Sequence, residues 1–147
     1  MSRPEPRLIT KILSLSAVQA LGITAVYPLK IPQGIPYPGV VYQVTRDWPE
    51  SPADGRCNTH WCRIRVTCLA RVTAGVPGYQ AVRALASAIE GDSNPVTEPT
   101  GISGWFDSEG NCWIKEESMD GLGTIIEGTD EFEAYAIDQF YLTAYAN

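Results

Sequence analysis

Cysteine and histidine residues gather in the first half of the chain, at Cys57, His60, Cys62 and Cys68. Thiolates and imidazoles are the ligands that Zn²⁺ prefers, so this group raises the question of a metal site. However, Cys62 and Cys68 lie on one expected strand, about 20 Å apart at ~3.3 Å per residue, and cannot share one ion. The sequence has no Cys-x-x-Cys pair, and Cys112 stands alone. We therefore expect buried cysteines that act as small hydrophobic residues, and no metal site.

Nucleophilic catalysis by a cysteine–histidine pair is also poorly supported. His60 is the only histidine and lies two residues from Cys62 on an alternating strand. Their side chains would share a face at roughly 7 Å, whereas a thiolate needs a base within hydrogen-bond reach and a third group to orient that base. The pattern therefore predicts no catalytic residue of this type.

Other residue types that could do chemistry are arranged in ways that do not favour it. The acidic pairs Glu116-Glu117 and Asp130-Glu131 are adjacent residues, whose side chains point apart on a strand. The glycines at 121–123 follow no strand–helix pattern of a phosphate-binding loop. The four tryptophans lack interleaved basic residues, so we expect them in the core and at interfaces rather than under stacked bases. We predict no catalytic or cofactor-binding residue, no cofactor, and a protein that is not an enzyme.

Charge is distributed unevenly along the chain. Residues 1–89 carry a net charge of +6 and residues 90–147 a net charge of −12, which gives −6 for all 147 residues. The two halves either have segregated solvated faces or complement each other between copies of the chain. An acidic pI near 4.7 argues against a nucleic-acid-binding domain. No apolar run approaches the ~20 residues of a membrane span, and we expect no signal peptide and no membrane partner.

Hydrophobic periodicity predicts the elements that would position these residues. We expect one domain over 1–147, with helices over 5–21 and 77–90, strands over 23–29, 39–47, 60–71 and 131–145, a hairpin across 105–114, and a long loop over 118–130. This order predicts an α+β fold, in which a single antiparallel β-sheet carries two α-helices packed on one face, plus a β-hairpin and a long loop. The last strand is apolar on both faces, which suggests that a neighbour covers its second face.

A proline-rich segment leads into the strand over 39–47. Pro28, Pro32, Pro36 and Pro38 each fix φ and remove a backbone donor, so this segment can form neither a helix nor a central strand. A stiff segment keeps its shape before a partner arrives and loses less conformational entropy on docking. We interpret residues 27–48 as an assembly element.

The order of segments resembles that of the tail-terminator (tail-completion) proteins of long-tailed bacteriophages. The segments that carry the resemblance are the N-terminal helix, Tyr27-Pro28 through Pro32-Gln33-Gly34 to Pro36-Tyr37-Pro38, Val40-Val41-Tyr42, Trp61–Arg71, the alanine-rich helix Tyr79–Ile89, and Phe140-Tyr141-Leu142. They cover most of the chain in order, while the four cysteines and residues 118–131 lie outside the resemblance.

The resemblance implies a structural virion protein at the neck or top of the tail, which assembles in the host cytoplasm. Its copies would form a homo-hexameric ring that caps the tail tube, stops its polymerisation and joins the head. Its partners would be other copies, the tail tube protein and a neck or head-completion connector, with DNA passing through the lumen without specific binding. The expected interface residues are Tyr27, Pro32, Pro36, Tyr37, Pro38, Arg63, Arg65, Arg71 and Tyr141. The expected lumen-facing acids are Glu116, Glu117, Asp120, Glu127, Asp130 and Glu131.

Two other functions remain open from the sequence. A neck connector between portal and tail belongs to the same class of assembly protein. A small cytosolic α+β ligand-binding domain or enzyme belongs to another class, in which the tyrosines and tryptophans would line a pocket. A ring-forming subunit and a stable small dimer with a bound metabolite would be distinguished by their mass in solution.

Overall fold

The computed structural model describes residues 3–31, 38–49, 59–71, 78–91, 99–116, 124–127 and 134–146. Within these ranges, only the backbone is described for Arg71, Thr124–Glu127, Ala134 and Ala146. The elements are α1 (Glu5–Ser14), α2 (Ser16–Gln19), β1 (Val26–Pro28), β2 (Gly39–Pro49), β3 (Thr59–Arg71), α3 (Gly78–Glu90), β4 (Trp113–Lys115), β5 (Thr124–Glu127) and β6 (Ala134–Ala146).

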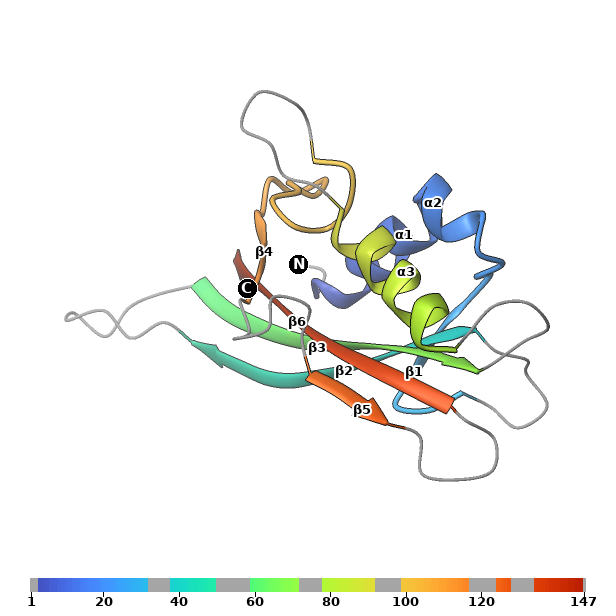
Figure 1. Ribbon diagram of the computed structural model, residues 1–147. Helices are drawn as coiled ribbons and strands as arrows, with labels where there is room; N and C mark the ends of the chain where they lie inside the picture. Colours follow the sequence, from blue (N-terminus) through green and yellow to red (C-terminus); the bar gives the residue numbers. More distant parts are fainter. Residues whose placement is uncertain are drawn as a thin grey trace.

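The strands form one sheet in the order β1-β2-β3-β6-β4, with β5 also pairing with β6 (Figure 1). Strands β2, β3 and β6 are long and antiparallel, and they make up most of the sheet. The α+β class with one mainly antiparallel sheet is therefore confirmed. The sheet is nevertheless mixed, because β1 runs parallel to β2, with Val26 opposite Val40. An alternating pattern of side chains carries no information on strand direction, so the sequence could not show this.

The helices lie on one face of the sheet (Figure 1). Helix α3 packs on β3 and β6, and α2 packs against α3. The core between these layers is fully apolar on the β3 side, where the alternating residues of one face are at most 1% exposed: Cys62, Ile64, Val66, Cys68 and Ala70. The prediction that this face of β3 is buried is confirmed, as is the helix expected over 77–90.

The helix expected over 5–21 is broken into two. Leu15 adopts an extended conformation, with φ −71° and ψ 122°, and separates α1 from α2. The Ser14 hydroxyl donates to the backbone carbonyl of Lys11 at 2.7 Å, and the Gln19 amide donates to a carbonyl near the end of α1 at 2.9 Å. Polar side chains of this kind compete with the helical backbone hydrogen bonds, so they stabilise the break. The break allows Leu15 to turn into the core, where it is 8% exposed.

The predicted hairpin forms, and the predicted long loop contains a strand. Phe106 pairs with Cys112, and Gly110 has the positive φ of 81° that the turn requires. Strand β5 pairs with residues 135–138 of β6, so the expectation of a loop over all of 118–130 is wrong for residues 124–127. A four-residue strand beside glycines is too short for its periodicity to stand out. None of the helices in the described ranges is long and apolar enough to cross a membrane.

Candidate functional site: the open face of the sheet

The face of the sheet opposite the helices is covered by no helix of the described chain (Figure 1). We call this surface the open face. The strand registers place the following side chains on it: Val41, Gln43, Arg46, Trp48, Trp61, Arg63, Arg65, Thr67, Leu69, Ile114, Ala136, Asp138, Phe140 and Leu142. Large apolar side chains and three arginines therefore share one surface. Such a surface, with apolar area beside charged groups, is typical of an interaction site.

A β-bulge decides which residues of β2 reach the open face. The register shifts between Val44 and Arg46, so Thr45 has no partner residue on β3. Simple alternation from Val44 would place Arg46 and Trp48 under the helices. Because the bulge adds a residue, they instead lie opposite Arg63 and Trp61 on the open face. Sequence reasoning therefore missed Arg46 and Trp48, and nothing in the local pattern marks the bulge.

Two arginines of the open face lie over aromatic rings. The guanidinium carbon of Arg46 is 4.3 Å from the centre of the Trp48 ring, and that of Arg63 is 4.0 Å from the centre of the Phe140 ring. Arg63 also donates from Nε to Glu116 at 2.7 Å. Stacking on a ring holds each guanidinium in a defined orientation while its nitrogen atoms remain able to donate. This end of the open face is suited to bind carboxylate groups in a bidentate manner.

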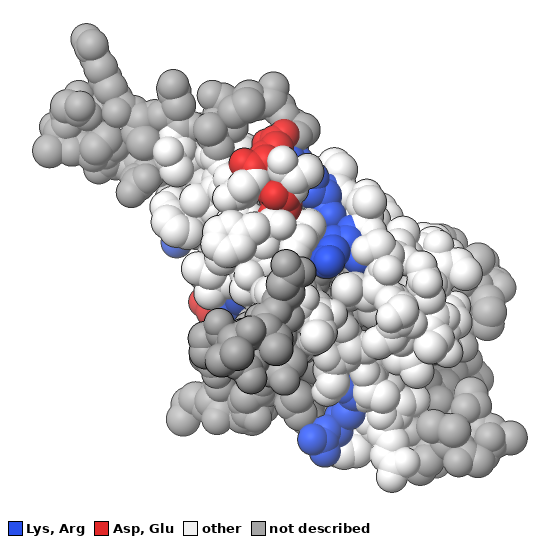
Figure 2. Space-filling view, turned by 90° about the horizontal axis from the view of Figure 1, so that it is seen from above, with Lys and Arg blue, Asp and Glu red and all other residues white. Residues whose placement is uncertain are grey.

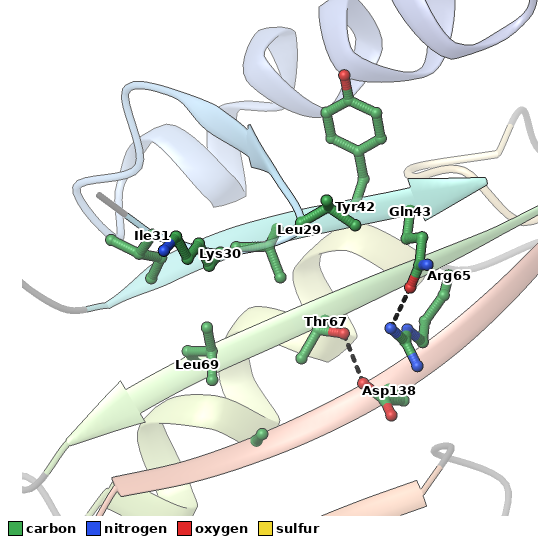
Figure 3. A pocket seen from close by; sticks show the side chains of 11 residues that line it. Leu29, Lys30, Ile31, Tyr42, Gln43, Arg65, Thr67, Leu69 and Asp138 are labelled. Atoms are coloured by element: carbon green, nitrogen blue, oxygen red, sulfur yellow. Dashed lines mark hydrogen bonds between the residues drawn. The ribbon is translucent and has the colours of Figure 1, made fainter. Parts of the chain in front are cut away.

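The other end of the open face holds a groove of about 410 Å³ (Figure 3). One wall is the segment Leu29–Ile31, and the floor comes from β2, β3 and β6. Across the floor, Arg65 donates to Gln43, and Thr67 donates from its hydroxyl to Asp138 at 2.5 Å. The groove thus combines apolar side chains, such as Leu29 and Leu69, with the cation of Lys30 and two hydrogen-bonded polar pairs on its floor.

The wall of the groove is formed by a strained turn. Leu29 has φ 66°, and the Lys30 amide donates to the Pro28 carbonyl at 2.7 Å, which closes a tight γ-turn. A positive φ is an uncommon conformation for a bulky residue such as leucine. The turn leads to Ile31, which covers Gly39 so closely that an added Cβ there would lie 2.2 Å from its Cδ1. The start of the proline-rich segment is thereby fixed beside the open face, with Leu29 67% exposed.

A polar cluster lies on the other side of the sheet, near one end. Asp47 accepts hydrogen bonds from the Tyr145 hydroxyl at 2.8 Å and from Arg3 at 2.9 Å. Burial, and then the hydrogen bond to Asp47, raise the pKa of Tyr145 to about 12. Burial also raises the pKa of the nearby Cys62 thiol to about 12, so it stays protonated at neutral pH. The cluster joins the N-terminal segment to β2, and a protonated thiol is a poor nucleophile.

The structure places the predicted interface residues in different surroundings. Arg63 and Arg65 lie together on the open face, and Tyr27 and Pro38 are half-buried near the β1 edge. Tyr141 is fully buried among the core residues, with its hydroxyl 3.1 Å from Gln139. Its predicted contact with a partner is therefore wrong, because its side chain faces the helices of its own subunit. Three predicted residues (Pro32, Pro36 and Tyr37) and the side chain of Arg71 lie outside the described residues.

Of the predicted lumen-facing acids, only Glu116 has a described side chain, which is 41% exposed. Glu116 is bound to Arg63, so part of its charge is balanced within the subunit. Glu127 lies on β5, where only the backbone is described, and the other four predicted acids lie outside the described residues. The assignment of these acids to a lumen stays a prediction.

The helix side of the molecule differs from the open face. Its described surface is mostly uncharged, with separate clusters of Lys and Arg and a group of acidic side chains next to one cluster (Figure 2). One cation there is Arg83 of α3, an exposed residue whose guanidinium lies 5.6 Å from the Tyr79 ring. No group of His, Cys, Asp and Glu within the described ranges is arranged to hold a metal ion. The open face is therefore the best candidate for a functional surface.

No protein-family model matches this chain, and no curated protein matches its sequence.

Proposed function

We propose that this protein is the subunit of a homo-hexameric ring that terminates the tail of a long-tailed bacteriophage. The ring caps the last ring of tail tube protein and stops tube polymerisation. It then provides the surface for head–tail joining, and DNA passes through its lumen. The proposal rests on the order of sequence segments described above and on the open face of the sheet.

The observation that carries the proposal is that one side of the sheet, including its three long strands β2, β3 and β6, has no cover from described helices. On the helix side, residues such as Ile64, Val66 and Ile137 are fully buried. On the open face, Ile114 is 50% exposed, and Phe140 and Leu142 are only partly buried. Covering such apolar area contributes about 25 cal/mol per Å² removed from water. A subunit of a ring gains this stabilisation when a neighbour packs on the sheet.

The distribution of charge supports an assembly through unlike surfaces. The first 89 residues carry +6 and the remaining residues −12, so a basic part of one copy complements an acidic part of the next. Contacts between unlike surfaces form closed rings when the rotation between copies closes. An acidic lumen would repel DNA phosphates, so DNA would slide through it without binding.

Two alternatives make use of the same features. A neck connector would use the open face in the same way, but would join portal to tail instead of ending the tube. A ligand-binding domain is favoured by the groove of about 410 Å³, which falls in the size range of small-molecule sites. The ring-forming function is preferred because the groove is open and occupies only one end of a larger apolar and basic surface.

Deletion of this gene from a phage that encodes it tests the proposal directly. We expect tails of abnormal length that lack heads, because tube growth is no longer stopped and the joining surface is missing. Electron microscopy of lysates measures tail length, and expression of the gene from a plasmid should restore normal virions. Tails of normal length that lack heads would favour the neck connector, and normal virions would contradict both assembly functions.

A further inference from the structure

Two like charges face each other on the open face without an acid between them. Arg46 lies directly opposite Arg63 in the β2–β3 register. Like charges in this position destabilise a sheet. Arg63 is balanced by Glu116, whereas Arg46 forms no ion pair with any residue of the described ranges. The fold therefore keeps an exposed, unbalanced cation beside a second one, which is the arrangement that an incoming anion would stabilise.

The residues around Arg46 and Arg63 indicate which kind of anionic ligand this site would bind. Leu142 lies next to Arg63 across the β3–β6 ladder, and Ile114 lies next to Leu142 across the β6–β4 ladder. A ligand at this place meets two guanidiniums and a half-exposed aliphatic surface. The carboxylate of Glu116, which is bound to Arg63, would repel the many phosphates of a nucleic acid. A protein segment that carries a carboxylate beside apolar side chains fits this combination best.

We propose that Arg46 and Arg63 form the receptor for a carboxylate from the acidic second half of a neighbouring copy of this chain. The inference rests on the proposed ring, and it names one of the contacts that would join its subunits. The second half supplies the charge, since residues 90–147 contain thirteen acids and one lysine. Stacking on Trp48 and Phe140 holds both guanidiniums in place before the neighbour arrives, which reduces the entropy lost on binding.

A charge reversal at Arg46 tests the inference. Arg46 is exposed, so the R46E variant is expected to fold, and circular dichroism and thermal unfolding verify this. The matched control is R83E, which makes the same change at an exposed arginine that lies near a tyrosine ring on the helix side. Sedimentation equilibrium of the full chain at low and high salt measures self-association.

We expect R46E to weaken self-association by roughly tenfold or more at low salt, and R83E to leave it nearly unchanged. Salt should reduce the difference, because a surface ion pair is screened. R46K should recover only part of the affinity, because a lysine keeps the charge without the planar fork of arginine.

Equal behaviour of R46E and R83E would overturn the inference, and so would a wild-type chain that stays monomeric at all concentrations. Fluorescence anisotropy with a labelled single-stranded oligonucleotide examines the competing ligand. Tight binding by the wild type that R46E abolishes would assign the two arginines to phosphate instead. The phage deletion measures tail termination without reference to Arg46, so the ring contact can fail while the proposed function stands.

Discussion

At the scale of residues, Asp107 at the start of the hairpin turn is a buried carboxylate with several hydrogen-bond donors around it. Its side chain is 0% exposed. One carboxylate oxygen accepts from Arg7 at 2.8 Å and from the Trp113 indole at 3.1 Å, and the other accepts from two backbone amides of the turn. Burial alone would raise the pKa of Asp107, but these donors outweigh it and hold the pKa below its usual value. The carboxylate thus joins α1, the turn and β4.

Replacing Asp107 by asparagine should destabilise the protein by about 3 kcal/mol, because it removes the fully buried anion that lies 2.8 Å from the Arg7 guanidinium. Urea unfolding at pH 7 measures the loss. The control is E109Q, which removes a more exposed carboxylate 3.3 Å from Arg7 and should cost under about 1 kcal/mol. Equal effects of the two variants would show that Asp107 has no special structural role.

The lowered pKa of Asp107 also predicts a dependence on pH. Its contribution to stability is present above the unfolded-state pKa near 4, and is lost as the pH falls through the lower folded-state pKa. The wild type should therefore lose more stability than D107N as the pH falls from 5 to below the unfolded-state pKa near 4.

At the scale of elements, the end of α3 is joined to the following segment by a close contact between two glycines. An added Cβ on Gly101 would lie 2.5 Å from the Ile89 carbonyl oxygen, and one on Gly91 would lie 2.1 Å from the Gly101 amide nitrogen. The contact allows the amides of Ile102 and Ser103 to donate to the last carbonyls of α3 at 2.9 and 3.1 Å. These hydrogen bonds satisfy helix-end carbonyls that would otherwise lack partners.

Replacing Gly101 by alanine should cost about 2–3 kcal/mol, because backbone atoms would have to move to accommodate the methyl group. The matched control is G110A, in which the methyl group meets nothing within 4 Å but the residue has φ 81°. We expect about 1 kcal/mol there, from backbone strain alone. Thermal unfolding of both variants measures the difference, and a milder effect at Gly101 than at Gly110 would contradict the proposed close contact.

At the scale of the whole molecule, one sheet has a filled face and an open one, and the charge of the chain is divided between its halves. These two properties support a subunit that is completed by its neighbours. A closed ring needs two unlike, complementary surfaces on each copy, and in the proposed ring the open face would provide the basic one at Arg46 and Arg63.

We therefore expect the purified chain to form a ring of defined mass at low salt. A monomer that assembles only on tail tubes would keep the proposed terminator function but overturn the contact inferred at Arg46 and Arg63. Size-exclusion chromatography with light scattering measures the mass over a range of protein and salt concentrations. Raising the salt should shift a ring toward smaller species, because contacts between unlike charges are screened. A stable, salt-insensitive dimer with a bound metabolite would instead favour a ligand-binding function for the groove.

The sequence by itself determined the features that depend on local periodicity and on turn-forming residues. The alternation of Cys62 with Ile64 and Val66 identifies the buried face of β3, and the stripe of apolar residues identifies α3. Gly110 marks the hairpin turn, since only a positive φ closes it without strain. Each of these features can be predicted from a few consecutive residues.

Only the tertiary structure decided which surfaces face outward. Both faces of β6 are apolar, so periodicity alone could not show that Tyr141 lies in the core while Phe140 and Leu142 lie on the open face. The bulge at Thr45 turns Arg46 to that face, and the bulge itself depends on the register between β2 and β3. The direction of β1 depends in the same way on its partner strand. The direction of these side chains depends on contacts between segments that are distant in the sequence, and a local sequence pattern does not predict those contacts.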